Sequence, residues 1–248
     1  MREIDWYKIG VLTVIGLGCL SALRAWPQNT GIKAGSANSL PMNTTSFKTG
    51  GTLTESGIRP KAARLYWKAA RELHQGYPAS AEKDAIRALR IDKTFADAAA
   101  LEATAALAQQ HFDRARADAA HATEIDSADE KAWVILATAD NHLGRYSEAT
   151  EALRHVQLQD EGTWQVAYQW ARAEAGLQNL QQCLEWTNRA ALSAPQDFAP
   201  LHLLRASVLQ AAGEFARAAG QLEIYLQLPG VNASQRDLLT QELHRLRK

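Results

Sequence analysis

Cysteine is scarce in this chain of 248 residues, and neither sign of charge is in excess. The two cysteines, Cys19 and Cys183, lie far apart, so we expect neither a disulfide framework nor a thiolate metal site, and packing must hold the fold. Lys+Arg and Asp+Glu both number 27, which gives a formal net charge of zero. A protein that binds nucleic acid or an anionic surface is expected to carry a basic excess or a basic run, and the sequence indicates neither.

Catalytic motifs are missing as well. No two of the seven histidines form the i, i+4 pair of a helical metal site, and no glycine-rich phosphate loop occurs. Asp92, Asp126 and Asp160 recur at a spacing of 34 residues, which indicates turn residues rather than acid–base pairs. His142, beside Asn141, is the most interesting histidine, although a solvent-facing side chain is the simpler interpretation. We therefore expect no enzyme, no cofactor, no metal ion and no small-molecule substrate.

Long apolar runs are limited to one, at residues 9–23, which carries no charge. Trp6 and Trp26 flank this run, and the 21 residues between and including them are enough helix to cross a bilayer. Aromatic side chains at both ends suit the two membrane interfaces. We expect residues 1–26 to form a single-pass membrane anchor.

Two alternatives to the anchor stay open. The strictly uncharged part is only 15 residues long, which also fits a secretory signal cleaved near Ala22 or Ala25. Cys19 follows a small residue, as a lipidated cysteine does, but Gly16 stands where such signals usually carry leucine. The basic residues on the two sides barely discriminate the orientation. We expect a bacterial envelope protein whose C-terminal part is extracytoplasmic, or secreted or periplasmic if the signal is cleaved.

Residues 27–58 are of a different kind from the rest of the chain. They are rich in Gly, Ser, Thr and Asn and show neither helical nor strand periodicity. This composition predicts a flexible tether between the N-terminal segment and the remainder.

From residue 62 onward the sequence repeats itself every 34 residues. Five units can be aligned, with one inserted residue, Phe198, before the last: 62–95, 96–129, 130–163, 164–197 and 199–232. Their eighth residues are all alanine: Ala69, Ala103, Ala137, Ala171 and Ala206. Their twentieth residues are Ala81, Ala115, Ala149, Cys183 and Ala218. Their fifteenth residues are Gly76, Gln110, Gly144, Gln178 and Gly213, which predicts a turn between two helices in every unit.

This pattern resembles the tetratricopeptide repeat family. The third unit matches best, because Trp133, Leu136, Gly144, Tyr146 and Ala149 stand at signature positions. It departs from the signature where Ala137, Asp140 and Glu161 replace the early Gly, the early Tyr and the final Pro. The resemblance covers residues 62–232 and implies an all-α, right-handed solenoid of helical hairpins.

Small residues at fixed positions have a physical explanation. Where two helices cross closely, a larger side chain would hold their axes apart. Cys183 is therefore expected to be a small packing residue rather than a reactive thiol. After the fifth unit, residues 233–248 place Leu238, Leu239, Leu243 and Leu246 on one face, which predicts a helix that caps the stack.

The resemblance also implies a binding surface. First helices of such units line a concave groove that usually binds a peptide or a partner protein. The second, fifth, ninth and twelfth positions of the units give the candidate groove residues Tyr66, Leu73, Thr104, Leu107, Lys131, Val134, Thr138, Asn141, Tyr168, Arg172, Leu203 and Ser207. The Lys–Asn pair that grips a terminal carboxylate in chaperone-binding members is absent, which puts such a clamp in doubt.

Tyr168 and Arg172 are candidates for an exposed aromatic platform with a charged donor, the residue types that dominate interface hot spots. Trp164, Trp170 and Trp186 crowd the same unit and are expected to pack between helices. We therefore expect a membrane-tethered adaptor that binds a protein or peptide. The alternative is a structural component of an envelope assembly that associates with itself.

Overall fold

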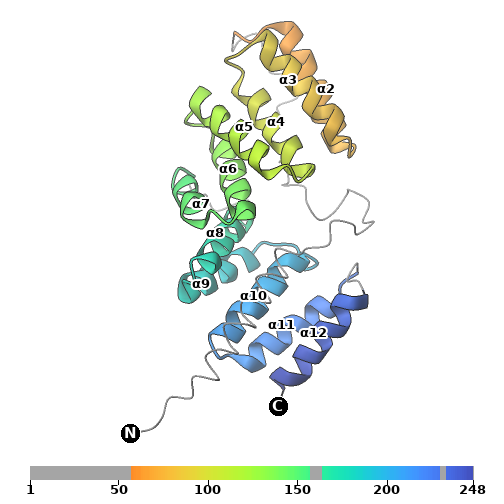
Figure 1. Ribbon diagram of the computed structural model, residues 1–248, viewed down its shortest axis with the longest axis vertical. Coiled ribbons are helices and arrows are strands. Elements are labelled where there is room, and N and C mark those ends of the chain that lie inside the picture. Colours follow the sequence, from red (N-terminus) through yellow and green to blue (C-terminus); the bar gives the residue numbers. More distant parts are fainter. Residues whose placement is uncertain (1–56, 157–163, 230–232, 248) are drawn as a thin grey trace.

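A computed structural model describes residues 57–156, 164–229 and 233–247 (Figure 1). This part is helical and contains no strand: α2 (Pro60–His74), α3 (Pro78–Ile91), α4 (Ala96–Ala108), α5 (Phe112–Ile125), α6 (Glu130–Leu143), α7 (Tyr146–Leu153), α8 (Trp164–Gly176), α9 (Leu180–Ala191), α10 (Ala199–Ala211), α11 (Phe215–Gln227) and α12 (Ala233–Leu246). The predicted anchor and nearly all of the predicted tether lie outside it. None of the described helices has the length and apolar character needed to cross a bilayer.

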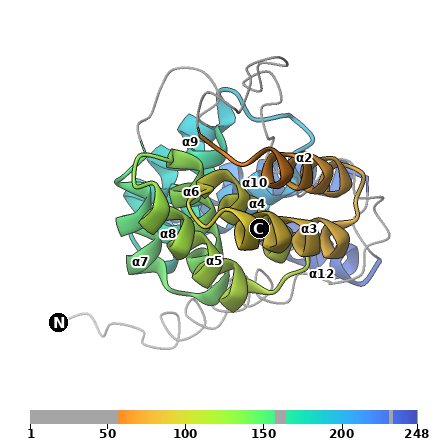
Figure 2. The same cartoon turned by 90° about the horizontal axis from the view of Figure 1, so that it is seen from above.

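Successive helices pack as five hairpins, followed by α12 (Figure 1). Helices α4, α6, α8 and α10 begin at residues 96, 130, 164 and 199, where the sequence units begin. The hairpins stack along the long axis of the molecule, and the view along that axis shows successive pairs turned relative to one another (Figure 2). The predicted fold class, an all-α, right-handed solenoid of helical hairpins, is confirmed.

The small residues of the repeat lie where the two helices of a hairpin cross. All five alanines at the eighth position and all five residues at the twentieth position are buried. In the fourth hairpin the Sγ of Cys183 donates to the backbone carbonyl of Ala171, 3.2 Å away, so the two positions face each other directly. Burial raises the pKa of the Cys183 thiol to about 12, which keeps it protonated and unreactive. Cys183 is a packing residue, as expected.

The turn within every hairpin uses a left-handed residue at the fifteenth position. Gly76, Gly144 and Gly213 have φ of 82°, 75° and 79°. Gln110 and Gln178 adopt the same conformation with φ of 62° and 63°. A side chain in this region of backbone space is unfavourable by about 1 kcal/mol because Cβ approaches the following carbonyl oxygen. The two glutamines are therefore strained positions that the fold enforces.

Replacing Gln110 or Gln178 by glycine is expected to raise the free energy of unfolding by about 0.5–1 kcal/mol. Both side chains are exposed, so the change removes the strain without removing a buried contact. Gln75→Gly provides the matched control because Gln75 is an exposed helix cap with φ of −78°. That variant should be slightly less stable than the parent in urea denaturation. A loss of stability in all three variants would show that the left-handed turns are not strained.

A phenylalanine packs in the interval before α4 and in the interval before α10. Phe95 lies after α3 and is 1% exposed, with its ring centroid 5.0 Å from that of Tyr66. The inserted Phe198 plays the corresponding part before α10, in contact with the rings of Trp164 and Tyr168. These phenylalanines join consecutive repeats, so they determine how deeply the neighbouring tyrosines are buried.

Helix α12 covers the last hairpin. Leu239, Leu243 and Leu246 pack with α10 and α11 residues such as Leu222. Leu238 is 66% exposed, so its predicted place on the packed face was wrong. It lies one residue, or about 100°, from Leu239 around the helix, which turns its side chain away from α11.

Candidate protein-interaction site

The first helices of the hairpins form one continuous layer. Each of α2, α4, α6 and α8 contacts the first helix of the next hairpin. Within the described residues, consecutive second helices make no comparable contacts. A curved stack brings the helices of its inner face together and separates those of its outer face. We call the layer of α2, α4, α6, α8 and α10 the inner layer; it is where the candidate groove residues were predicted.

Two of the predicted groove residues are buried in the core. Tyr66 is 4% exposed and Tyr168 is 8% exposed, each packed against the phenylalanine of the next interval. Burial raises the pKa of Tyr168, and the neighbouring Arg172 opposes this effect only in part. The interpretation of Tyr168 as an exposed aromatic platform was therefore wrong. Its ring joins α8 to the following repeat.

The hydroxyl groups predicted for the groove at the ninth position bond within their own helices. Thr104, Thr138 and Ser207 each donate to the backbone carbonyl four residues earlier, at 2.8, 2.7 and 3.0 Å. Leu73 is half-buried against the core of the first hairpin, and Lys131 is exposed at the start of α6. Half-buried Leu107 and Val134 and buried Leu203 complete the predicted set. These residues do not come together as one site.

Asn141 and Arg172 belong to a polar cluster between α6 and α8. The Asn141 Nδ2 donates to the backbone carbonyl of Gln169 at 2.9 Å and to its side-chain Oε1 at 3.0 Å. Asn141 and Gln169 are 3% and 5% exposed. The Oδ1 of Asn141 is buried and accepts no hydrogen bond in the described part of the chain. Such an oxygen is costly to leave unpaired, by about 1–3 kcal/mol, so it is a position where a donor would stabilise the protein.

His142 and Arg172 extend this cluster to the surface. The imidazole of His142 stacks on Phe112 of α5, with ring centroids 4.3 Å apart and planes within 6°. His142 is exposed, as its solvent-facing interpretation expected, and the stacked contact desolvates its ring only in part; this desolvation and the charge of Arg172 lower the pKa of His142, so the imidazole is neutral at physiological pH. Its Nε2 accepts a hydrogen bond from the Arg172 guanidinium at 3.1 Å, because arginine can only donate.

Arg172 is consequently held in place by a neutral group. Its hydrogen-bond partner among the described residues is His142, and no carboxylate in that part of the chain pairs with it. The guanidinium therefore keeps its full positive charge and has further N–H donors available. We call Asn141, His142, Gln169 and Arg172 the inner cluster.

Half of this cluster could be predicted from the sequence. Asn141 and Arg172 occupy the twelfth and ninth positions of their units, which were predicted to face the groove. Gln169 occupies the sixth position, which was not considered. His142 was singled out as the most interesting histidine, but its stacking on Phe112 comes from a helix of the previous unit. No pattern within one unit could have predicted that contact.

The tryptophans of the fourth unit pack between helices, as expected. Trp170 of α8 stacks on Trp186 of α9 with centroids 5.2 Å apart and planes within 8°. The Arg189 guanidinium lies 5.5 Å from the centroid of the Trp186 ring. Trp164 meets the ring of Phe198 edge-on. The aromatic side chains thus hold the fourth hairpin together.

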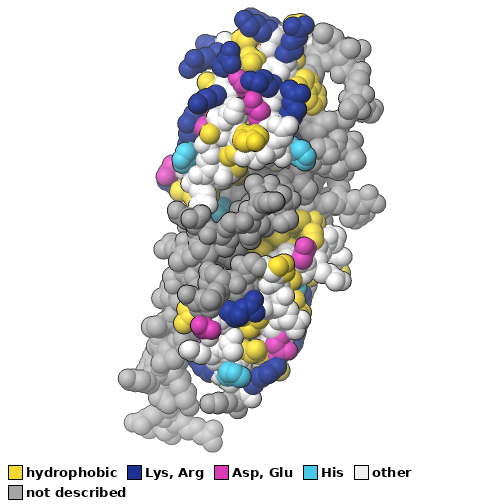
Figure 3. All heavy atoms as spheres, turned by 90° about the vertical axis from the view of Figure 1, so that its right-hand side faces the viewer, with side chains coloured by type: hydrophobic (Ala, Val, Ile, Leu, Met, Phe, Trp, Pro, Cys, Tyr) yellow, Lys and Arg dark blue, Asp and Glu magenta, His cyan; other side chains and the backbone are white. Residues whose placement is uncertain are grey.

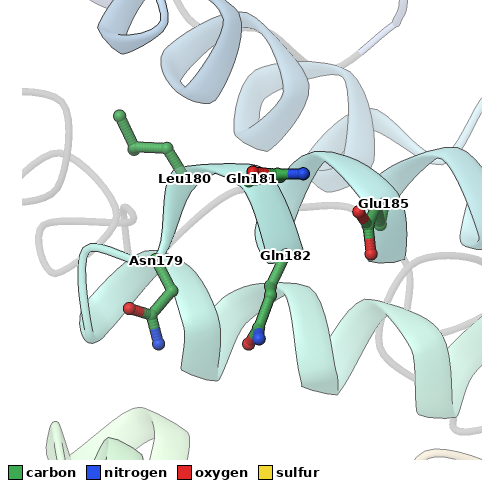
Figure 4. A pocket seen from close by; sticks show the side chains of 5 residues that line it. All are labelled: Asn179, Leu180, Gln181, Gln182 and Glu185. Carbon is green, nitrogen blue, oxygen red and sulfur yellow. The ribbon is translucent and has the colours of Figure 1, made fainter.

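A polar depression of about 470 Å³ lies at the start of α9, lined by Asn179, Leu180, Gln181, Gln182 and Glu185 (Figure 4). Asn179 and Gln182 point to one side of the helix and Leu180 to the other (Figure 4). The Nδ2 of Asn179 donates to Glu174 at 2.7 Å, so this amide stabilises the turn between α8 and α9. The described residues contain no group of three metal-ligating side chains. The depression is lined by three amides, one leucine and one carboxylate.

Comparison with known proteins supports the fold assignment. No protein-family model and no curated protein matches the sequence. Among solved structures, PilF of Pseudomonas aeruginosa has a TM-score of 0.63 at 21% identity and covers 77% of this chain and 86% of its own. PilW, a type IV pilus biogenesis factor, has a TM-score of 0.65 at 15% identity and covers 76% and 86%.

A third similar structure is YrrB, described as a tetratricopeptide repeat protein with an unusual peptide-binding site. Its TM-score is 0.57 at 15% identity, over 78% of this chain and 95% of its own. At such low identity these similarities concern the architecture and not the side chains. The chain therefore has the fold of the tetratricopeptide repeat proteins.

Proposed function

We propose that this protein is a non-enzymatic adaptor whose inner cluster binds an extended segment of a partner protein. Residues 6–26 would tether it to a membrane, with the hairpins outside the cytoplasm. The alternative N-terminal processing, cleavage of a signal, would leave the same adaptor free of the membrane.

The Arg172 guanidinium, which pairs with no carboxylate of the described residues, carries this proposal. The Oδ1 of Asn141 in the same cluster is buried and unpaired, so a backbone N–H of an extended peptide would reach it only by displacing the side chains that cover it. Arg172 lies on the next helix with an uncompensated charge, held by His142. A carboxylate of the same peptide would pair with that guanidinium through charge-assisted hydrogen bonds. Together the two groups define a partner segment with an acidic side chain or a terminal carboxylate.

The comparisons support the class of function and the compartment. YrrB is described as having an unusual peptide-binding site, and PilW as a type IV pilus biogenesis factor. Both similarities are of fold alone, so they support a binding surface without naming its partner.

Selection of displayed peptides against the full-length protein in nanodiscs tests the proposal. Peptides bound by the parent should be enriched in acidic residues, and Arg172→Ala should weaken their binding by about 10- to 100-fold, because a hydrogen bond to a charged group is lost. Arg154→Ala is the matched control, since Arg154 is exposed at the C-terminal end of α7, the second helix of its hairpin, and pairs with Glu151. If the parent and Arg172→Ala bind the peptides equally, and circular dichroism shows that both are folded, the inner cluster is not the binding site.

A further inference from the structure

The first hairpin carries a charge that the total composition conceals. Residues 57–94 contain nine basic residues and four acidic ones, although the whole chain is neutral. All nine basic side chains are exposed, whereas Glu82, Asp84 and Asp92 are buried and Glu72 is half-buried. We call this set the basic end: Arg59, Lys61, Arg64, Lys68, Arg71, Lys83, Arg87, Arg90 and Lys93. The exposed charged side chains of the first hairpin are therefore all positive.

Helical spacing gathers these cations on one side of each helix. Lys61, Arg64, Lys68 and Arg71 follow one another by three, four and three residues in α2. Residues separated in this way share one helix face. In α3, residues 83, 87 and 90 have the same kind of spacing.

Asp84 joins the two basic faces. Its carboxylate accepts from Lys68 Nζ of α2 at 2.6 Å and from Arg87 Nη1 of α3 at 2.8 Å. The Asp84 side chain is 4% exposed, so it lies beneath the two cations that it bridges. The faces of α2 and α3 therefore meet in one surface, and Figure 3 shows Lys and Arg side chains gathered over this end of the molecule.

Most of these cations are not neutralised. Six of them have no acidic partner within the described residues: Lys61, Arg64, Arg71, Lys83, Arg90 and Lys93. Repulsion among so many like charges disfavours the folded state, so a surface that keeps them is expected to serve an anionic partner.

Exposed aromatic side chains accompany the charge. Trp67, three residues after Arg64 in α2, is 43% exposed, and Tyr77, in the turn before α3, is 62% exposed. Trp and Tyr are the side chains that favour the headgroup level of a membrane, where one end of the ring is apolar and the other wet.

We propose that the basic end docks on the anionic headgroups of the membrane to which the chain is tethered. This inference rests on the proposed tethering: α2 begins two residues after the predicted tether, so the first hairpin is the one nearest in sequence to the predicted membrane segment. That position favours a lipid surface over a nucleic acid, which shares the phosphate chemistry. Docking would fix the solenoid on the membrane at its first hairpin and leave the inner cluster open to its partner.

Energy transfer from the basic end to the membrane measures docking in the full-length chain. On a Cys19→Ser background, Ser80→Cys places a donor dye on exposed Ser80 of α3, and buried Cys183 stays unlabelled. Gln241→Cys labels the opposite end of the solenoid, on α12. Nanodiscs carry acceptor-labelled headgroups in phosphatidylcholine alone or mixed with phosphatidylglycerol.

Phosphatidylglycerol should raise the transfer from position 80 but not from position 241, and high salt should abolish the increase. Neutralising four cations that lack partners should lower the docking equilibrium constant by about 100-fold or more, since each contributes roughly fivefold near an anionic surface. This basic-end variant carries Lys61→Gln, Arg64→Gln, Arg90→Gln and Lys93→Gln.

The control variant has the same net charge with its substitutions elsewhere, and it should dock like the parent. It carries Arg145→Gln, Arg154→Gln, Arg217→Gln and Arg245→Gln, all exposed in the parent. Equal loss in both variants, or no response to phosphatidylglycerol, would overturn the proposal. The proposal would also be overturned if the protein labelled at position 80 bound oligouridine RNA tightly and did not respond to phosphatidylglycerol. That result would assign the surface to a nucleic acid.

If the predicted membrane tether is wrong, the same experiment gives a different result. If the chain does not insert into nanodiscs of either lipid, the predicted anchor is wrong. The same labelled protein added to vesicles of phosphatidylcholine mixed with phosphatidylglycerol then still reports whether the basic end binds. Salt-sensitive transfer from position 80 supports docking in that case as well, and its absence overturns docking.

Discussion

Replacing Arg116 by alanine is expected to lower the free energy of unfolding by about 2–3 kcal/mol at neutral pH. Arg116 of α5 donates from Nε to the Oδ1 of Asp140 in α6 at 2.7 Å. The Asp140 side chain is only 2% exposed, so removing its partner leaves a buried carboxylate uncompensated. The Arg116 side chain is 36% exposed, which keeps the loss below that of a fully buried pair.

The loss should depend on pH in a defined direction. Burial raises the pKa of Asp140, and Arg116 opposes this; without Arg116 the pKa rises further. The folded protein then binds a proton more tightly than the unfolded chain, so stability recovers as pH falls through the raised pKa toward the ordinary value of about 3.9. Urea denaturation of Arg116→Ala and the parent at several pH values measures this recovery.

Two variants make the interpretation specific. Adding Asp140→Asn to Arg116→Ala should restore part of the stability and remove the pH dependence, because the buried charge is gone. Arg154→Ala breaks an exposed pair with Glu151 and should change stability by no more than about 0.5 kcal/mol. If Arg116→Ala and Arg154→Ala have equal effects, the ion pair between α5 and α6 is not a buried one.

Replacing Gly176 by alanine is expected to destabilise the protein by about 1–3 kcal/mol. Gly176 is the last residue of α8, and the ring of Tyr146 in α7 lies against its Cα. A Cβ at this position would stand 2.3 Å from the Cγ of that ring, a separation that no packing tolerates. The ring or the helix must move, and the contact between the third and fourth hairpins is lost.

Gly220 provides an unusually close control. It is a helical glycine in α11, and a Cβ there would meet no atom within 4 Å. Gly220→Ala should therefore raise stability by about 0.5–1 kcal/mol, because alanine loses less backbone entropy on folding. Thermal unfolding of the two variants should move in opposite directions, by several degrees for Gly176→Ala. A shift of the same sign in both would contradict the packing of Tyr146 on α8.

The fold could be predicted from the sequence because the same residue pattern recurs in five units. Alanine at the eighth position and a small residue at the twentieth fix the crossing of the two helices, and burial of Ala137 and Ala149 bears this out. The left-handed turn was also visible, since Gly144 in the third unit marks the conformation that Gln110 adopts under strain. Each unit alone would have been weak evidence.

The candidate site was less predictable because its contacts cross from unit to unit. Position within a unit indicates the direction of a side chain but not how deeply it is covered. Tyr168 occupies a predicted groove position of α8, yet Phe198 from the interval before α10 packs against it and it is buried. The bond from Asn141 to Gln169 likewise joins two units.

The basic end could not be predicted from the sequence for a related reason. The total charge and the runs of like charge do not show which charged side chains are exposed to solvent. In the first hairpin the helices turn Lys61 and Arg64 outward, while Glu82 and Asp84 are buried. A neutral chain therefore presents a positive surface, and only the fold separates the two signs.

Site-specific photo-cross-linking in cells of the native host tests whether the inner layer binds a partner protein. A photoreactive side chain at exposed Ala108 or Lys131 samples the inner layer, and one at exposed Glu151 or Arg189 samples the second helices. We expect both inner positions to cross-link one protein other than the chain itself, and Arg172→Ala to abolish these cross-links. If that protein is cross-linked only from positions 151 and 189, or if only a second copy of the chain is cross-linked, the inner layer is not the binding surface.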